Sequence, residues 1–160
     1  MSNNLAAATT LSPEPHAGST LNVLGVTHIY KVTGAETGGS LSFWEAVIPP
    51  GAGAPPHTHS REDEAFYVLR GEILIEREGA PAPLTVGQGG FFFGGRGRYH
   101  AFRNAGNETA RVLMLSTPSC GLDQMFAEFE AASSGGSMPD LGKLVAIASK
   151  YGVTIKPPSA

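Results

Sequence analysis

Short apolar runs alternate with breaks rich in glycine and proline through most of the chain. The runs occupy residues 21–33, 41–48, 64–69, 72–77, 84–86, 90–93, 99–104 and 110–116. β-Branched and aromatic residues in runs of this length favour strands, and the glycines and prolines between them favour turns. Short strands at this spacing predict an all-β fold, either a closed barrel or a sandwich.

The pattern changes to a helical period after Pro118. Apolar residues recur at i, i+3, i+4 and i+7 in two sets: Leu122, Met125, Phe126 and Phe129, then Leu141, Leu144, Val145 and Ala148. Two amphipathic helices are therefore predicted, with Asp140 as the N-cap of the second and Gly152 at its C-terminal end. We expect a mobile N-terminal arm over 1–20, a β-domain over 21–118 and a helical extension over 119–160 that packs on it.

Composition narrows the class of protein. A chain of 160 residues suits one domain with a single core. Cys120 is the only cysteine, which excludes an internal disulfide and suggests the reducing environment of the cytoplasm. A net charge of −3 without a Lys/Arg cluster disfavours nucleic acid as a partner. No apolar run approaches the roughly 18 to 20 residues that span a bilayer, so we expect a soluble protein.

Four side chains of metal-binding type stand out against this background. His57, His59 and Glu64 fall within eight positions, and His100 heads a later apolar run. Side chains at i and i+2 of a strand point to the same side, about 6 to 7 Å apart, so His57 and His59 can reach one ion. Imidazole and carboxylate donors predict one divalent transition metal ion, and Fe, Ni, Mn, Co, Cu and Zn all suit them.

The spacing of these residues resembles the two motifs of the cupin family. The first motif is matched by Gly51, His57, His59, Glu64 and Gly71, with five, one, four and six residues between them. The second is matched by Gly89, Gly97, His100 and Asn104. One position departs from the pattern, because Gly95 stands where a proline is usual.

The resemblance covers about residues 40–117 and implies a cupin β-barrel, or jelly roll, with two C-terminal α-helices. It implies one metal ion held by His57, His59, Glu64 and His100. The layout is similar to that of small quercetin-dioxygenase-like cupins. That likeness implies a dioxygenase that acts on an enolic or phenolic small molecule with O2, with Glu64 as the catalytic base. Cupins commonly pair through edge strands, so we also expect a homodimer.

Alternation along the strands suggests which residues lie beside the metal. Phe66 and Val68 share the face of Glu64, and Phe102 shares the face of His100, so these three are candidates for a substrate pocket. Ordinary core packing explains them equally well. The sequence does not decide which face is taken by Trp44, Phe91, Phe92, Phe93, Met114 and Phe126.

Other titratable residues are assigned no part in the site. Glu62 and Asp63 are expected to be solvated charges in a turn, and His16 and His28 have no partner in either motif. Three further functions stay open: a metal-dependent isomerase or cyclase that does not use O2, a non-catalytic module that binds a small molecule or metal, and a metal-free epimerase-like cupin. The complete ligand set disfavours the last of these.

Overall fold

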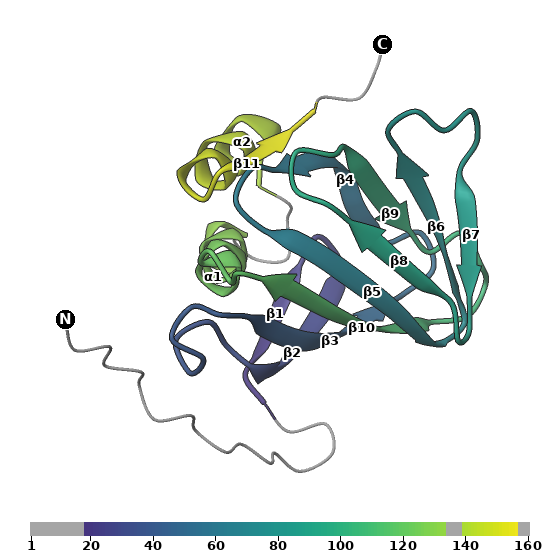
Figure 1. The fold of residues 1–160 in the computed structure, drawn as a ribbon, viewed down its shortest axis with the longest axis horizontal. Coiled ribbons are helices and arrows are strands. Elements are labelled where there is room, and N and C mark those ends of the chain that lie inside the picture. The colour runs from purple at the N-terminus through teal and green to yellow at the C-terminus, as the bar shows by residue number, and fades with distance from the viewer. Residues whose placement is uncertain (1–17, 134–138, 157–160) are drawn as a thin grey trace, which may run out of the picture.

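The computed structural model describes residues 18–133 and 139–156, which form two antiparallel β-sheets and two helices (Figure 1). The first sheet has the order β1 (Thr20–Val23), β2 (Val26–Val32), β3 (Ser42–Ile48), β10 (Ala110–Thr117), β5 (Asp63–Arg70) and β8 (Phe91–Gly94). The second has the order β11 (Val153–Ile155), β4 (Gly53–His59), β9 (His100–Arg103), β6 (Glu72–Arg77) and β7 (Leu84–Gly87). The all-β prediction is confirmed, and the arrangement is of the jelly-roll type. Most of the predicted arm, residues 1–17, lies outside the described residues.

The core lies between the two sheets and follows the strict alternation of the strands. Every second side chain of β10 points inward from Ala110 to Ser116, and all four are buried. Trp44 and Phe66 from the first sheet and Ile73 and Ile75 from the second are at most 1% exposed. Because strand neighbours such as β3 and β10 are far apart in sequence, the fold brings distant segments onto one buried surface.

The first apolar run is a hairpin rather than one strand. Leu24 and Gly25 form its two-residue turn with φ values of 53° and 80°, and Val23 pairs with Val26. Positive φ at both central residues is typical of a type I′ turn, which is usually marked by Asn-Gly or Asp-Gly. Leucine seldom adopts this conformation, so the sequence carries no clear sign of the turn.

Helices α1 (Leu122–Ala132) and α2 (Leu141–Lys150) confirm the helical period seen after Pro118. Helix α1 buries Leu122, Met125 and Phe129 and packs beside β1, where the Asn22 amide donates to Glu130 Oε1 at 2.7 Å. The Asp140 side chain caps α2 by accepting from the Lys143 amide at 3.0 Å, as predicted. Gly152 follows the helix with a φ of 78°. Neither helix of the described segments is long and apolar enough to cross a membrane.

The stretch after α2 contains a strand that the sequence analysis placed within a helical extension. Strand β11 pairs with β4, so that Val153 faces His59 and Ile155 faces His57. Two backbone bonds extend this ladder, from the Lys156 amide to the Pro56 carbonyl at 2.8 Å and from the Ser60 amide to the Gly152 carbonyl at 3.0 Å. Three residues are too few to show the alternation of a strand in the sequence. Strand β11 forms because β4 supplies its hydrogen-bond partners. Strand β4 is thereby held between β9 and β11.

Candidate metal centre

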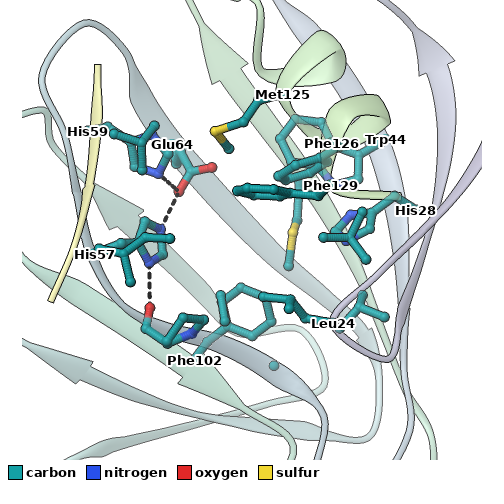
Figure 2. A pocket seen from close by; sticks show the side chains of 18 of the residues that line it. Leu24, His28, Trp44, His57, His59, Glu64, Phe102, Met125, Phe126 and Phe129 are labelled. Atoms are coloured by element: carbon teal, nitrogen blue, oxygen red, sulfur yellow. Dashed lines mark hydrogen bonds and ion pairs between the residues drawn. The ribbon is translucent and has the colours of Figure 1, made fainter. Parts of the chain in front are cut away.

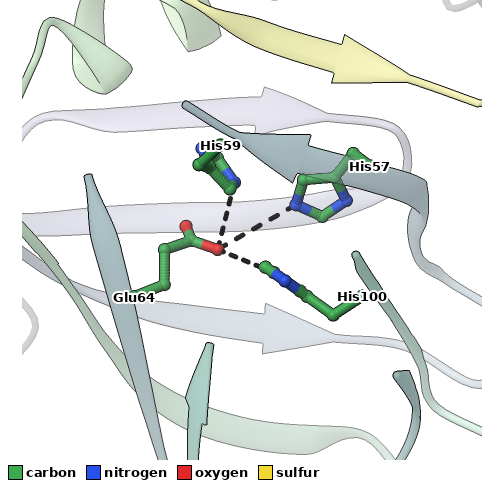
Figure 3. Close-up of side chains that lie close together, drawn as sticks. All are labelled: His57, His59, Glu64 and His100. Atoms are coloured by element: carbon green, nitrogen blue, oxygen red, sulfur yellow. Dashed lines mark hydrogen bonds and ion pairs between the residues drawn. The ribbon is translucent and has the colours of Figure 1, made fainter. Parts of the chain in front are cut away.

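The four candidate ligands converge from three strands on one buried point (Figure 3). Their ligand atoms all lie within 4.8 Å of one another. Glu64 Oε2, on β5, lies 3.0 Å from His100 Nε2, 3.2 Å from His59 Nε2 and 3.9 Å from His57 Nε2. His57 and His59 share one face of β4, and His100 pairs with His57 from β9. The opposing sheet supplies Glu64, so the cluster exists only when the two sheets face each other.

Each imidazole is oriented by an acceptor at its other nitrogen. His57 Nδ1 donates to the Pro55 carbonyl at 2.7 Å, and His59 Nδ1 donates to Glu62 Oε1 at 2.6 Å. His100 Nδ1 lies 3.4 Å from the Arg98 carbonyl. Because carbonyl and carboxylate oxygens only accept, these contacts place the proton on Nδ1 and turn Nε2 toward the cluster. This is the usual arrangement of metal-binding histidines, and buried His59 Nε2 has no hydrogen-bond partner among the described residues. The donor set therefore fits a transition metal ion.

Glu62 belongs to this arrangement, and its assignment as a solvated turn charge is wrong. Its side chain is 1% exposed because the turn after β4 bends back and delivers its carboxylate to His59. Asp63 instead bonds Arg96, with its Oδ2 2.7 Å from the guanidinium. Both acids follow His59 in one polar stretch, Ser60 to Asp63. Nothing in that stretch distinguishes them, because only the path of the turn decides which one points inward.

The charges in the cluster are strongly coupled. Burial opposes the charge on Glu64, yet the imidazoles of His59, His100 and His57 hold the pKa of this carboxyl well below its usual range. Burial also opposes a charge on His59, but Glu64 and Glu62 together raise the pKa of this imidazole to about 10. Burial lowers the pKa of His57. Metal ligands must be deprotonated, so metal binding would release the proton that His59 holds.

Comparison with known proteins identifies the region that carries this cluster. Residues 44–116 match the family model described as a cupin domain, and all four candidate ligands lie inside the match. Residues 44–116 are a cupin domain. The resemblance seen in the two sequence motifs is thereby confirmed.

Several known proteins are similar to the cupin domain and its flanks. "Polyketide synthase CurC" from Streptomyces cyaneus is 29% identical over 108 residues, which is 68% of this chain and 65% of that protein. An "oxalate-binding protein" from Thermotoga maritima is 33% identical over 73 residues, or 46% of this chain and 59% of that protein. The chain thus spans less than two thirds of the length of these curated relatives.

Solved structures share the fold. A "predicted oxalate decarboxylase" from Thermotoga maritima superimposes with a TM-score of 0.59 at 21% identity, covering 69% of this chain and 99% of that one. KdgF from Halomonas sp. gives 0.52 at 22% identity, covering 59% and 81%. At these identities the likeness concerns the cupin fold alone.

The cluster of candidate ligands in the cupin domain opens onto an apolar cavity of about 70 Å³ (Figure 2). His57, His59 and Glu64 form part of its wall. The rest is almost entirely apolar and includes Phe66, Phe102, Trp44, Met114, Met125, Phe126 and Phe129. Such a volume corresponds to roughly two water molecules at liquid density, so the cavity suits a compact ligand.

The three pocket candidates differ in their positions. Phe66 and Phe102 line the cavity, and their rings meet edge to face with centroids 5.5 Å apart. Val68 is fully buried but is not among the described residues of the cavity wall. It lies four positions beyond Glu64 along β5, or roughly 13 Å, so it packs deeper in the core. Alternation predicts the face of a side chain but not its depth.

The structure decides the positions of the six residues whose face the sequence left open. Trp44, Met114 and Phe126 line the cavity. Phe92 is buried with its ring 5.6 Å from that of Phe66, measured between centroids. Phe91 and Phe93, on the other face of β8, are exposed.

His28 is a residue of the cavity that the sequence analysis missed. It is buried on β2, lines the cavity and packs against Phe126 with ring centroids 4.5 Å apart. Burial lowers the pKa of His28 to about 3 against a weaker opposing effect of Glu64, so the ring is neutral at pH 7. Its Nδ1 has no hydrogen-bond partner in the described structure. Alternation from Val26 to Tyr30 places His28 on the inward face and was the available signal.

Proposed function

We propose that this protein is a metal-dependent cupin enzyme, a quercetinase-like dioxygenase that acts on a compact enolic or phenolic molecule with O2. One observation carries the proposal: three of the four candidate ligands also form the wall of the apolar cavity. A small molecule in that cavity would meet the metal position directly, as a catalytic site requires. A purely structural metal site would have no need of such access.

The metal would be held by His57, His59, Glu64 and His100. A divalent Fe, Ni, Mn, Co, Cu or Zn ion bound there would act as a Lewis acid toward a substrate hydroxyl, since four protein donors leave room for further ligands. Glu62, Pro55 and Arg98 keep the imidazoles in orientation. The apolar wall excludes bulk water and so strengthens the charge interactions inside the cavity.

Glu64 is the residue we assign to proton transfer. Its Oε2 makes all three contacts to the imidazoles, and Oε1 makes none of these contacts. We assign to Oε1 the role of accepting the proton from the substrate hydroxyl. The imidazoles lower the pKa of Glu64, which is opposite to the effect expected from the apolar surroundings alone, so the carboxylate accepts this proton only from an acidified hydroxyl.

The similarity to a protein named polyketide synthase supports this class of substrate. Polyketides are rich in enolic and phenolic hydroxyl groups, which are the groups that a metal-bound site of this kind can ionise. The similarity covers 65% of that relative.

The experiment measures oxygen consumption and product formation. Protein loaded with each candidate metal in turn is mixed with a panel of single-ring phenols, enols and flavonols in an oxygen electrode, and products are identified by mass spectrometry. We expect consumption of O2 with at least one compound. His57→Ala should lose both bound metal and turnover, because it removes a ligand.

The contrary outcomes are distinct. Binding of the panel without oxygen consumption or any product would refute the dioxygenase proposal. Turnover that persists without oxygen would instead identify an isomerase or cyclase. Full metal content in both His57→Ala and His100→Ala would refute the metal site itself.

A further inference from the structure

The apolar cavity is small for a substrate that contains a ring. Its volume of about 70 Å³ is about half of the roughly 150 Å³ in which an apolar cavity binds benzene. Protein interiors are close-packed, so a larger ligand requires a side chain of the wall to be displaced. The cavity therefore admits a short enol beside the metal position but not a six-membered ring.

Leu24 is a wall residue with an unusual backbone conformation. It occupies the first position of the two-residue turn between β1 and β2, with a φ of 53°. Among the described residues other than glycine, only Leu24 and Cys120 have a positive φ. Asparagine, aspartate and glycine adopt this conformation with far less strain, so a leucine opposes the formation of the turn. Strained positions of this kind cluster at functional sites, where the side chain serves a purpose other than stability.

The side chain of Leu24 reaches the cavity. It lines the wall and packs against the core while it remains half-buried, whereas the neighbouring Gly25 is exposed. Figure 2 shows Leu24 across the cavity from His57 and Glu64. A polar residue would form the turn better but would leave the apolar wall incomplete at this point. The wall of the cavity, rather than the turn, therefore explains the leucine.

We propose that Leu24 is a specificity-determining residue, whose side chain limits the cavity to enols smaller than a benzene ring. The inference rests on the proposed function and selects its enolic substrates over its phenolic ones. Truncation of a single buried leucine can leave a cavity of roughly 150 Å³, so the loss of this one side chain is sufficient to admit a ring. The selectivity arises because the wall opposes the larger ligand.

The test uses acetohydroxamate and benzohydroxamate, which chelate a metal through the same two oxygens and differ only in a methyl or a phenyl group. Their dissociation constants for the zinc-loaded protein are measured by calorimetry. Zinc has no redox chemistry, so turnover does not contribute. In the wild type we expect acetohydroxamate to bind at least about tenfold more tightly, because overpacking opposes the phenyl ring.

Variants assign the size limit to Leu24. Leu24→Gly should lower the preference for acetohydroxamate to within about twofold or reverse it, whereas Leu24→Met, which keeps an apolar side chain of similar volume, should retain it. Leu21→Ala is the matched control, because Leu21 also packs against the core but is not among the described residues of the cavity wall. It should leave the preference intact. If Leu24→Gly does not fold, Leu24→Asn shortens the same side chain with a residue that suits the turn.

Thermal unfolding separates the size limit from ordinary packing. Leu24→Gly relieves the left-handed strain, so its unfolding temperature should be at least as high as that of Leu21→Ala, although it removes the larger group. A lower temperature would remove the strain on which the inference rests and so overturn it.

Four binding results would also overturn the inference: equal or tighter binding of benzohydroxamate in the wild type, an unchanged preference in Leu24→Gly, an equal loss of preference in Leu21→Ala, or no binding of either compound. Its failure is separable from that of the proposed function. Turnover of a single-ring phenol by the wild type would refute only this inference, whereas the size preference without any oxygen consumption would refute the dioxygenase and keep the size limit.

Discussion

At the scale of single residues, the cluster depends as much on the groups behind the histidines as on the histidines themselves. The acceptors at Nδ1 come from a proline carbonyl, a carboxylate and an arginine carbonyl, all local in sequence. Glu62 is the only side chain among these three acceptors, and so the only one that a substitution removes. It is also the only charged acceptor, and it increases the basicity of His59.

The two neighbouring acids, Glu62 and Asp63, provide a matched test. Glu62→Ala should weaken metal binding by about 10-fold to 100-fold, and Glu62→Gln by less, because the amide oxygen can still accept from Nδ1. Asp63→Asn removes one negative charge from the neighbouring residue, whose side chain bonds Arg96 rather than His59. This variant should change the affinity for metal by less than about twofold. Competition with a chromophoric chelator measures each affinity. Equal affinities of the Glu62 variants and the wild type would contradict the orienting role.

His59 also predicts how the stability of the metal-free protein depends on pH. Its pKa is about 10 in the folded chain, against an ordinary value of 6.5. Between these values the folded state holds a proton that the unfolded state has released, so stability falls as pH rises. The contribution is complete below pH 6.5, and its loss has a limiting slope on the order of 1 kcal/mol per pH unit.

Urea unfolding of metal-free protein from pH 6.5 to 9 measures this effect. The wild type should lose stability across the range, and His59→Gln should show a clearly smaller loss because it cannot hold the proton. A flat profile in the wild type would contradict the charge state that we assign to the cluster.

At the scale of elements, strand β4 carries two candidate ligands and is held from both sides. Strand β9 supplies His100 on one side, and β11 supports the backbone of His57 and His59 on the other. Because β11 also places Val153 and Ile155 in the cavity wall, this short strand contributes to both the cluster and the pocket. Its loss should therefore affect metal binding more than its length suggests.

Thr154→Pro tests this role of β11. Thr154 faces Thr58 between the backbone bonds that join Lys156 to Pro56 and Ser60 to Gly152, so the alternation of an antiparallel ladder makes this a hydrogen-bonded pair. Proline removes the donor and should lower metal affinity by at least about fivefold, whereas Thr154→Val keeps the amide and should not. Isothermal titration with the metal measures both. Unchanged affinity in the proline variant would show that β9 alone positions the ligands.

At the scale of the whole molecule, one edge of the first sheet carries exposed aromatic residues. Strand β8 is the edge of that sheet, and Phe91 and Phe93 on its outer face are 61% and 58% exposed. Tyr67 of β5 pairs with Phe91 and is 45% exposed. Exposed aromatic residues on an edge strand favour association. We expect a homodimer that uses this face.

Light scattering coupled to size exclusion checks the dimer. The wild type should have twice the mass of one chain, and Phe91→Lys with Phe93→Lys should shift it to the monomer by placing like charges at the contact. Leu141→Lys is the control, because Leu141 is also exposed but lies on α2. A monomeric wild type would refute the expectation, and a dimeric double variant would place the contact elsewhere.

The sequence by itself determined the strand-rich fold, the two helices and the identity of the four metal-ligand candidates. These features are local or regularly spaced: alternation defines a face, a helical period defines a stripe, and the spacing of His57, His59 and Glu64 lies within one strand and the start of the next. Such patterns are visible in a sequence because each depends on residues close together in the chain. His100 lies 36 positions after Glu64 and was identified by its match to the second motif.

Only the tertiary structure decided what surrounds those ligands. The path of one turn brought Glu62 rather than Asp63 to His59, and strand β11 acquired its place by pairing with β4. The packing of the two sheets against each other placed His28 in the cavity wall and Val68 in the core away from the cavity. Each outcome depends on the depth and direction of segments distant in sequence, and the alternation of residues along a single strand carries no information about either.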